Sequence, residues 1–289
     1  MKFVRYGLAG EERPGCLDAE GRVRDLSAHV DDLRGSALAP RQLAVLAGLK
    51  PQSLPLVEDV PRFGVPVSGI GKILGIGLNY RSHAAETGAT PGAEPMMFSK
   101  AITALSGPDD PIVIPPGSVK TDWEVELAVV IGLETRYVTE DKALSRIAGF
   151  TLINDVSERS YQKERGGQFV KGKSCDSFAP IGPWLVTVDE IADPQNVDLW
   201  LDVNGVRRQR GNTSDMIFPL AHLISHISQF MTLLPGDVIA TGTPDGVGAG
   251  QKPPQFLKPG DTVELGAAGL GRQYHDVIAY AGEASDRSD

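Results

Sequence analysis

The chain has 289 residues, of which 41% are hydrophobic and 22% are charged, the balance of a globular protein with room for one large domain or two unequal ones. Its net charge of -9 at pH 7 argues against nucleic acid or an anionic membrane surface as the main partner, because both attract basic proteins. No apolar run approaches the roughly 20 residues that span a bilayer, and residues 1–6 lack the apolar core of a signal peptide. We therefore expect a cytoplasmic protein that binds neither nucleic acid nor membranes.

The numbers of cysteine, glycine and proline residues further limit the fold classes that are possible. Cys16 and Cys175 are the only two cysteines, so a disulfide framework and a thiolate metal cluster are both excluded, and a reducing compartment is expected. The chain has 33 glycines and 21 prolines but only 6% aromatic residues, which indicates many turns between short strands. These proportions predict a β-rich fold.

The first part of the chain predicts a small unit without residues that suggest chemistry. It has an expected strand at residues 3–8 and an expected helix at residues 42–49. Residues 58–72 are rich in proline and glycine, which is typical of a connection between domains. We expect a small N-terminal α/β domain with its linker at residues 1–70 and a main domain at residues 71–289, ending in a disordered polar tail at residues 282–289.

The main domain is expected to open with an apolar strand at residues 73–79 that leads into a polar helical turn. His83 and Glu86 are three residues apart in that turn, so the carboxylate can hold one imidazole nitrogen while the other nitrogen removes a proton from water. The alternative is an exposed helical turn without a role. Gly75 and Gly77 do not form a dinucleotide fingerprint, because neither a third glycine nor an apolar helix follows them.

Residues 121–130 put two carboxylates into an otherwise apolar strand. Because successive strand side chains point to opposite faces, Glu124 and Glu126 share one face. Two close carboxylates need a shared proton, a basic partner or a divalent cation, and we interpret them as metal ligands; a solvated strand face is the alternative. Lys100 and Lys120 precede this strand and could either face the same site or lie on the surface.

A short helix is predicted at residues 139–148, with Thr139 as its N-cap and Gly149 beyond its end. Residues 150–156 are predicted to form the next strand, which is mainly apolar with polar residues near its end, where Asp155 contributes a carboxylate. A third carboxylate there would complete a set of oxygen ligands that suits a hard octahedral cation such as Mg²⁺ or Mn²⁺.

Residues 167–174 match the P-loop pattern, but we reject that interpretation. A P-loop follows an apolar strand and opens a helix. Here the preceding segment is polar, and the following segment contains Pro180 and Pro183, which a helix interior does not tolerate. A flexible loop is expected instead, in which Lys173 would either counter the charge of a bound anion or be an ordinary solvated lysine.

The C-terminal third predicts a hairpin, a helix and three strands. Asn204 and Gly205 mark the hairpin turn. On the helix expected at residues 217–231, His222 and His226 have the spacing of a zinc pair but lack the acidic neighbour of a metalloprotease. The strands are expected at residues 238–241, 262–265 and 274–280, and the glycine-rich segment 241–248 could bind a carboxylate through its backbone N–H groups.

Five short motifs follow one another along the main domain. They are Gly77-Leu-Asn-Tyr-Arg-Ser-His-Ala-Ala-Glu86, Trp123-Glu-Val-Glu-Leu127, Asn154-Asp155, Lys171-Gly-Lys-Ser174 and Thr241-Gly-Thr-Pro-Asp-Gly-Val-Gly248. In this order they resemble the fumarylacetoacetate hydrolase family over roughly residues 71–280. The resemblance implies a β-rich α+β fold with a mixed β-roll, similar to a sandwich or barrel, around the active site. It also implies a requirement for Mg²⁺ or Mn²⁺ and a homodimer or higher homo-oligomer.

The resemblance also implies roles for residues of this chain. The metal ligands would be Glu124, Glu126 and Asp155. The catalytic residues would be His83, Glu86 and Lys173. The positions that contact the oxo-acid end of the substrate would be Arg159, Gln162 and Thr243.

The implied reaction is hydrolysis of the C3–C4 bond of a 2,4-dioxo acid to pyruvate and a second acid. His83, oriented by Glu86, would deprotonate the attacking water, the cation would stabilise the pyruvate enolate, and Lys173 would stabilise an oxyanion or help to protonate the enolate. Residues 168–184 resemble the bacterial branch that hydrolyses 2,4-diketo-3-deoxy acids derived from L-rhamnonate or L-fuconate, which would give L-lactate as the second acid.

Other activities stay open at this stage. Fumarylpyruvate hydrolase and oxaloacetate decarboxylase would use the same kind of site, and ureidoglycolate lyase would need no water-activating pair. A metal-binding or ligand-binding protein without turnover is a further alternative. The presence of both His83 and Glu86 counts against that last alternative.

Overall fold

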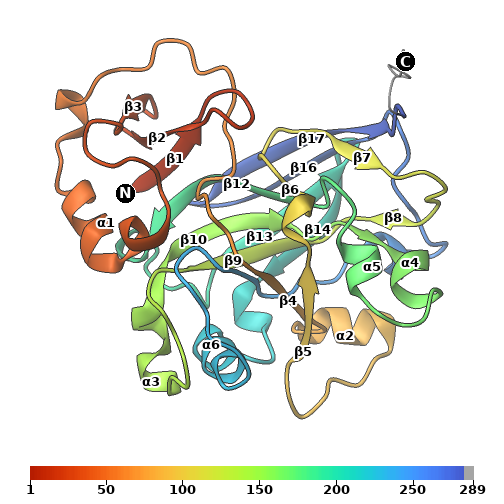
Figure 1. Cartoon of the computed structure of the whole chain (residues 1–289). Helices are drawn as coiled ribbons and strands as arrows, with labels where there is room; N and C mark the ends of the chain where they lie inside the picture. The colour runs from red at the N-terminus through yellow and green to blue at the C-terminus, as the bar shows by residue number, and fades with distance from the viewer. Residues whose placement is uncertain (283–289) are drawn as a thin grey trace, which may run out of the picture.

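The computed structural model describes residues 1–282 (Figure 1), so nearly all of the tail expected at residues 282–289 lies outside the described residues. Within residues 1–282 the largest sheet has ten strands. In spatial order these are β3 (Val23–Asp25), β2 (Arg13–Leu17), β1 (Lys2–Tyr6), β12 (Ala179–Thr187), β10 (Ile147–Asn154), β9 (Val125–Ile131), β15 (Val238–Ala240), β4 (Ile73–Gly77) and β5 (Met96–Lys100), with β6 (Leu105–Ser106) paired to β12. The sheet is mixed, since β15 with β4 and β12 with β6 are parallel pairs.

Two smaller sheets complete the strand-rich architecture. One consists of β14 (Val206–Asn212), β13 (Asp198–Val203), β16 (Thr262–Ala267), β17 (Gly271–Ala279) and β7 (Ile112–Ile114). The other pairs β11 (Ser157–Glu158) with β8 (Thr121–Asp122). The five-stranded sheet packs on the large one, as β13 contacts β9 and β17 contacts β12. Among the described residues the sheets stay open and do not close into a barrel, and the expected β-rich α+β fold with a mixed β-roll is confirmed.

The helices are short and lie around the sheets (Figure 1). They are α1 (Pro40–Ala47), α2 (Arg81–Thr87), α3 (Glu140–Ala143), α4 (Arg159–Lys163), α5 (Val170–Lys173) and α6 (Leu220–Ser228). A bilayer-spanning helix, which would have to be long and apolar, does not occur in residues 1–282.

The central strands form the core of the molecule. Every residue of β9 and β10 is buried, as is typical of strands that are covered on both faces. Their antiparallel register pairs Val125 with Asn154 and Glu126 with Ile153. The two strands therefore bring the Glu-x-Glu segment next to the end of β10, where Asp155 follows.

The N-terminal strands extend the same sheet. β1 pairs with β12 through Lys2 and Val186 and through Phe3 and Leu185, and Phe3 belongs to the same hydrophobic cluster as the central strands. The division of the chain at residue 70 stays a prediction, because a continuous sheet is compatible with one domain or with two.

Two helix predictions were wrong in extent. The helix expected at residues 139–148 ends as α3 at Ala143, and after a single 3₁₀ turn β10 begins at Ile147. Gly149 therefore lies inside a strand, where a Cβ atom would come within 2.1 Å of the Val186 carbonyl oxygen on β12. The helix expected at residues 217–231 is shorter at both ends, because Pro219 is its N-cap and it ends at Ser228.

The turn at Asn204 and Gly205 was predicted correctly. Both residues have positive φ, 52° and 72°, as a two-residue type I′ turn requires, and they join β13 to β14.

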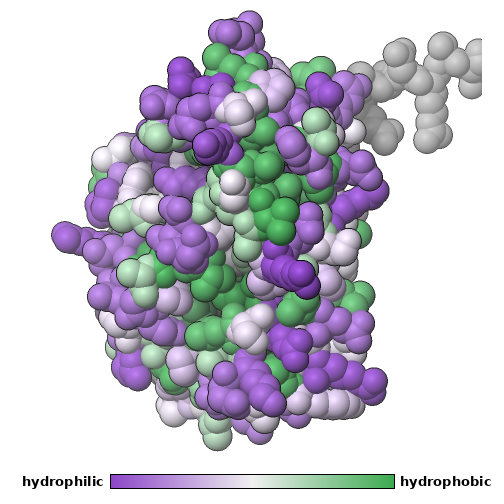
Figure 2. Space-filling model, turned by 90° about the vertical axis from the view of Figure 1, so that its left-hand side faces the viewer, coloured by the Kyte–Doolittle hydropathy of each residue, from purple (hydrophilic) through white to green (hydrophobic). Residues whose placement is uncertain are grey.

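The side of the molecule that carries α1 and α3 has an apolar stripe between hydrophilic residues (Figure 2). A groove between α1 and the end of β12 is lined by Leu43, Ala47, Ala148 and Val188. This groove shares none of its lining residues with the cavity that contains the buried carboxylates.

Candidate active site around a carboxylate cluster

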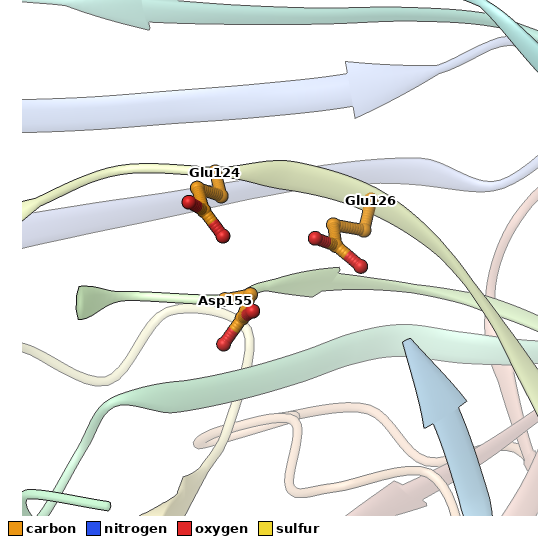
Figure 3. A group of neighbouring side chains, drawn as sticks. All are labelled: Glu124, Glu126 and Asp155. Carbon is orange, nitrogen blue, oxygen red and sulfur yellow. The ribbon is translucent and has the colours of Figure 1, made fainter. Parts of the chain in front are cut away.

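Three buried carboxylates meet where β9 begins and β10 ends. Glu124 directly precedes β9, Glu126 lies within it and Asp155 directly follows β10. One carboxylate oxygen from each residue lies within 4.8 Å of the others, and Figure 3 shows the three side chains around one space. Two hydrogen bonds fix this arrangement: the Asp155 amide donates to the Glu124 carbonyl oxygen (2.9 Å), and the Glu124 amide donates to Asn154 Oδ1 (3.1 Å).

Basic side chains neutralise two of the three carboxylates. Lys173 Nζ lies 2.6 Å from Glu124 Oε2 and 2.5 Å from Asp155 Oδ2. Arg159 Nη2 lies 2.6 Å from Glu124 Oε1, and Lys100 Nζ lies 2.6 Å from Asp155 Oδ1. Burial alone would raise the pKa of Glu124, but Lys173 and Arg159 outweigh it and hold that pKa far below its usual range.

Glu126 has no basic partner among the described residues. Its Oε2 accepts a hydrogen bond from the Gly242 amide (2.7 Å). Burial, together with the charges of Asp155 and Glu124, raises the pKa of Glu126 well above its usual value. Within the protein alone, Glu126 is therefore favoured in its protonated, neutral form.

The cluster fits a hard divalent cation. Its possible ligands are carboxylate oxygens, which Mg²⁺ and Mn²⁺ prefer. The oxygens are close enough to share one ion, and a cation bound there would take the place of the proton on Glu126. Glu124, Glu126 and Asp155 are thus the residues that could hold it, as the sequence predicted.

The His83–Glu86 pair lies beside the carboxylates. α2 places the two side chains one turn apart, with His83 Nδ1 3.1 Å from Glu86 Oε2. The other oxygen, Glu86 Oε1, accepts a hydrogen bond from the Gly246 amide at 2.9 Å. The carboxylate is therefore held from two sides, and His83 faces the same cavity as Glu124 and Glu126.

The cavity has a volume of about 250 Å³, below the roughly 300–1,000 Å³ that is typical of sites for drug-sized ligands. Seven of the nine residues predicted for the site line it: His83, Glu124, Glu126, Arg159, Gln162, Lys173 and Thr243. Glu86 contacts His83, and Asp155 contacts Lys173, from behind this lining. Apolar side chains also line the cavity, among them Leu78, Met96, Phe98, Phe169 and Val247.

The three residues predicted to contact substrate differ in how they are held. Arg159 Nη1 donates to Gln162 Oε1 (3.2 Å), one turn along α4. The hydroxyl of Thr243 donates to the Val125 carbonyl oxygen (2.9 Å) and accepts from Gln209 Nε2 (2.8 Å). Thr243 therefore already uses its hydroxyl proton within the protein, whereas Arg159 and Gln162 keep further donors.

Sequence reasoning missed Asp122, which organises one side of the site. Its Oδ2 accepts from Arg159 Nε (2.8 Å) and from the Ala249 amide (2.9 Å), and its Oδ1 accepts from the Gly248 amide (2.6 Å). Asp122 thus ties Arg159 to the glycine-rich loop. The only signal in the sequence was a third acidic residue next to the Glu-x-Glu segment.

The sequence did not decide whether Lys100 and Lys120 face the site or the surface, and the structure places them differently. Lys100 is buried against Asp155, whereas Lys120 pairs with Glu164 at the surface. Lys173 is also buried, so the solvated alternative for it was wrong. The segment that matched the P-loop pattern opens only the four-residue α5 and follows α4 instead of a strand, in agreement with our rejection of that pattern.

The two helix-face histidines lie away from the carboxylates. On α6 the rings of His222 and His226 stack on each other and pack between Phe218 and Phe230. Among the described residues the group of His, Cys, Asp or Glu side chains close enough to share a metal is the carboxylate cluster.

Comparison with known proteins agrees with this geometry. The sequence profile of the family "Fumarylacetoacetate (FAA) hydrolase C-terminal" matches residues 72–278. A curated relative from Burkholderia ambifaria (strain MC40-6), named provisionally as a hydrolase, is 58% identical over 274 residues, which are 94% of this chain and 97% of the relative.

Solved structures are similar over almost the full length. The fumarylacetoacetate hydrolase of psychrophilic Exiguobacterium antarcticum is 35% identical, with a TM-score of 0.82, and the alignment covers 97% of this chain and 100% of that chain. The maleylpyruvate hydrolase of Sphingobium sp. SYK-6 is 27% identical, with a TM-score of 0.75, and the alignment again covers 97% of this chain and 100% of that chain.

Proposed function

The chain belongs to the fumarylacetoacetate hydrolase family, and from this premise we propose that it is a metal-dependent hydrolase that cleaves the C3–C4 bond of a 2,4-dioxo acid. Members of the family are hydrolases and isomerases. The observation that carries the proposal is the meeting of a carboxylate cluster, a His83–Glu86 pair and buried Lys173 at one cavity. This combination provides a cation site and a base for water side by side.

The oxo-acid end of the substrate would bind at the carboxylate cluster. A divalent cation, Mg²⁺ or Mn²⁺, held there by Glu124, Glu126 and Asp155 would supply a Lewis acid that stabilises negative charge on the substrate oxygens. Arg159 and Gln162 line the cavity next to Glu124. Their remaining N–H groups would hold the substrate carboxylate and orient the chain of the acid along the cavity.

His83 would act as the general base. Its Nδ1 hydrogen bond to Glu86 favours the tautomer in which Nε2 carries a lone pair, and that nitrogen would accept a proton from the water that attacks the C4 carbonyl carbon. Glu86 would stabilise the resulting imidazolium. Lys173, which lies at the cavity wall next to Glu124 and Asp155, would donate a hydrogen bond to the oxygen on which negative charge develops.

The substrate that we favour is 2,4-diketo-3-deoxy-L-rhamnonate or its L-fuconate counterpart, which would give pyruvate and L-lactate. Both acids end in a methyl group, and apolar side chains, among them Met96, Phe98 and Phe169, form part of the cavity lining. A methyl group loses little by leaving water for such a wall, whereas a second carboxylate would lose its hydration. This supports a methyl-ended acid over fumarylpyruvate.

Pyruvate release from a small substrate panel tests the proposal. The panel is acetylpyruvate, fumarylpyruvate, oxaloacetate and 2,4-diketo-3-deoxy-L-rhamnonate, each measured with Mg²⁺ and with EDTA. We expect metal-dependent pyruvate release that is fastest from the diketo sugar acid. Pyruvate from oxaloacetate alone would identify a decarboxylase. Consumption of substrate without pyruvate would point to an isomerase. No reaction with any of the four substrates would contradict an acylpyruvate hydrolase.

We further propose that the protein works as a homodimer or higher homo-oligomer, by analogy with the family. Light scattering coupled to gel filtration tests this directly: a mass of one chain at micromolar concentration would contradict it.

A further inference from the structure

Lys100, the last residue of β5, has a fully buried side chain. Its ammonium group lies 2.6 Å from Asp155 Oδ1 and 3.1 Å from the Val156 carbonyl oxygen. The second oxygen, Asp155 Oδ2, faces Lys173 instead. The two oxygens of Asp155 are therefore held by two different lysines.

These two lysines have different access to the cavity. Lys173 lines it, but Lys100 is not among the lining residues. Its backbone pairs with Ile73 of β4 in the sheet, and the next residue, Ala101, donates its amide hydrogen to Ser174 Oγ (2.9 Å). Lys100 thus contacts Asp155 from within the protein and cannot contact a substrate in the cavity. Any effect of Lys100 on the site must therefore be exerted through Asp155.

The same arrangement recurs at all three carboxylates. Each has one oxygen held by a donor from the surrounding protein: Glu124 Oε1 by Arg159 Nη2 (2.6 Å), Glu126 Oε2 by the Gly242 amide (2.7 Å) and Asp155 Oδ1 by Lys100 Nζ (2.6 Å). The other three oxygens, Glu124 Oε2, Glu126 Oε1 and Asp155 Oδ2, form what we call the inner set. Two of the inner set, Glu124 Oε2 and Asp155 Oδ2, pair with Lys173 Nζ, which lines the cavity, so a cation bound to the inner set would take the place of this ammonium group.

We propose that Lys100 is a positioning residue that makes Asp155 bind a cation through Oδ2 alone. A carboxylate can offer a metal one oxygen or two, and the ion pair with Lys100 occupies the second. This inference rests on the proposed metal-dependent function and specifies how the site is built. An octahedral ion with one oxygen from each of the three carboxylates keeps about three positions for water or substrate. Two of these positions are what a 2-oxo acid needs to chelate the ion through its carboxylate and oxo oxygens.

Without Lys100 the free Oδ1 would turn toward the ion and bind as a second ligand atom. One open position would be lost, and a chelating acid would then have to displace a protein ligand. The ion itself would stay bound, because the carboxylates are unchanged. The inference therefore separates binding of the cation from binding of the substrate.

The test uses Mn²⁺ as the probe cation and oxalate as a flat mimic of the 2-oxo-acid end. Lys100→Met is compared with wild type and with Lys120→Met, which removes a surface lysine whose partner is Glu164. The number of exchangeable waters on bound Mn²⁺ is measured from the line broadening of its electron paramagnetic resonance spectrum in ¹⁷O-labelled water. Binding of oxalate to the Mn²⁺-loaded proteins is measured by calorimetry.

We expect about three exchangeable waters in wild type and in Lys120→Met, and about two in Lys100→Met. Oxalate should bind about tenfold more weakly to Lys100→Met, while Mn²⁺ binds at least as tightly as to wild type. If the water number and the oxalate affinity of Lys100→Met are unchanged, the inference is overturned. Lys100 would then only balance the negative charge of Asp155.

Two further outcomes remain informative. If Lys100→Met does not fold, the wild-type water number still tests the inference, because two waters instead of three would contradict a site in which each carboxylate binds through one oxygen. If wild type binds no Mn²⁺ at all, the proposed metal-dependent function fails, and this inference fails with it for that separate reason.

Discussion

His83 Nδ1 lies 3.1 Å from Glu86 Oε2, within a single turn of α2. The contact orients the imidazole, and the Gly246 amide fixes Glu86 from the other side. A base that removes a proton from water needs this kind of support, because a positive charge develops on its ring during the reaction. The pair thus connects the glycine-rich loop to the proposed chemistry.

The first prediction concerns the base. His83→Ala should lower kcat for hydrolysis of a 2,4-dioxo acid by at least about 100-fold, since general-base catalysis contributes roughly that much. Pyruvate release from oxaloacetate needs no activated water, so any such activity should fall less than about tenfold. His226→Ala, on the surface helix α6, is the control and should leave both rates unchanged. Equal losses of both activities in His83→Ala would contradict the role of a water-activating base.

The second prediction concerns the loop that holds Glu86. A Cβ atom at Gly246, where φ is +98°, would lie 2.0 Å from the Arg208 carbonyl oxygen, so Gly246→Ala must move the backbone whose amide binds Glu86. We expect a loss of at least about tenfold in kcat and a lower melting temperature. Gly260→Ala is matched in φ, +93°, but has open space around the added atom. It should cost only about 1 kcal/mol of stability and no activity, and equal effects of the two changes would refute the account of the loop.

The third prediction concerns Asp122. Asp122→Asn removes the charge that holds Arg159 Nε, and hydrogen bonds to charged groups contribute roughly 1.5–3 kcal/mol. The KM for the dioxo acid should rise about tenfold or more, with a smaller change in kcat, because Arg159 would orient the substrate carboxylate less well. Asp202→Asn, which breaks an exposed pair with Arg207, is the matched control. A KM as low as that of wild type would show that Arg159 keeps its place without Asp122.

The fourth prediction concerns pH and the N-terminal strands. Burial alone would raise the pKa of Asp18, but hydrogen bonds from the Arg22 amide and from the Arg24 and Arg22 side chains lower it to about 2. A carboxyl with a depressed folded-state pKa adds stability above its unfolded pKa of roughly 3.9, and that stability is lost as the pH falls toward 2. The melting temperature of wild type should therefore fall further between pH 4 and pH 2 than that of Asp18→Asn. Identical pH profiles for the two proteins would contradict this, and carbon-13 resonances of the aspartate side chains provide a direct reading of the pKa.

The parts of the site that depend on local periodicity were predictable from the sequence. Glu124 and Glu126 share a face because strand side chains alternate, and His83 meets Glu86 because helical residues three apart are neighbours. Asp155 could be placed because a buried strand ended in a lone carboxylate. In each case the information lay within a few residues of the chain.

The parts that depend on distant strands were not predictable. Lys100 on β5 reaches Asp155 although β9, β15 and β4 lie between β5 and β10 in the sheet order, and nothing near Lys100 in the sequence marks it as buried. The helix expected to run as far as Ala148 failed for a similar reason. Gly149 is needed inside β10, where the backbone of β12 comes too close for a side chain, and this close contact is invisible in local sequence.

The most direct test of the whole account is a metal titration of activity. The protein is stripped with EDTA and dialysed, and pyruvate release from 2,4-diketo-3-deoxy-L-rhamnonate, or from acetylpyruvate, is followed as Mn²⁺ is added, with Glu126→Gln measured in parallel. We expect no activity without metal, a rise that saturates at about one equivalent per chain because the three carboxylates share a single ion, and much weaker Mn²⁺ binding by Glu126→Gln. Full activity of the stripped protein, or a Glu126→Gln variant that titrates like wild type, would contradict the claim that Glu124, Glu126 and Asp155 hold the catalytic cation.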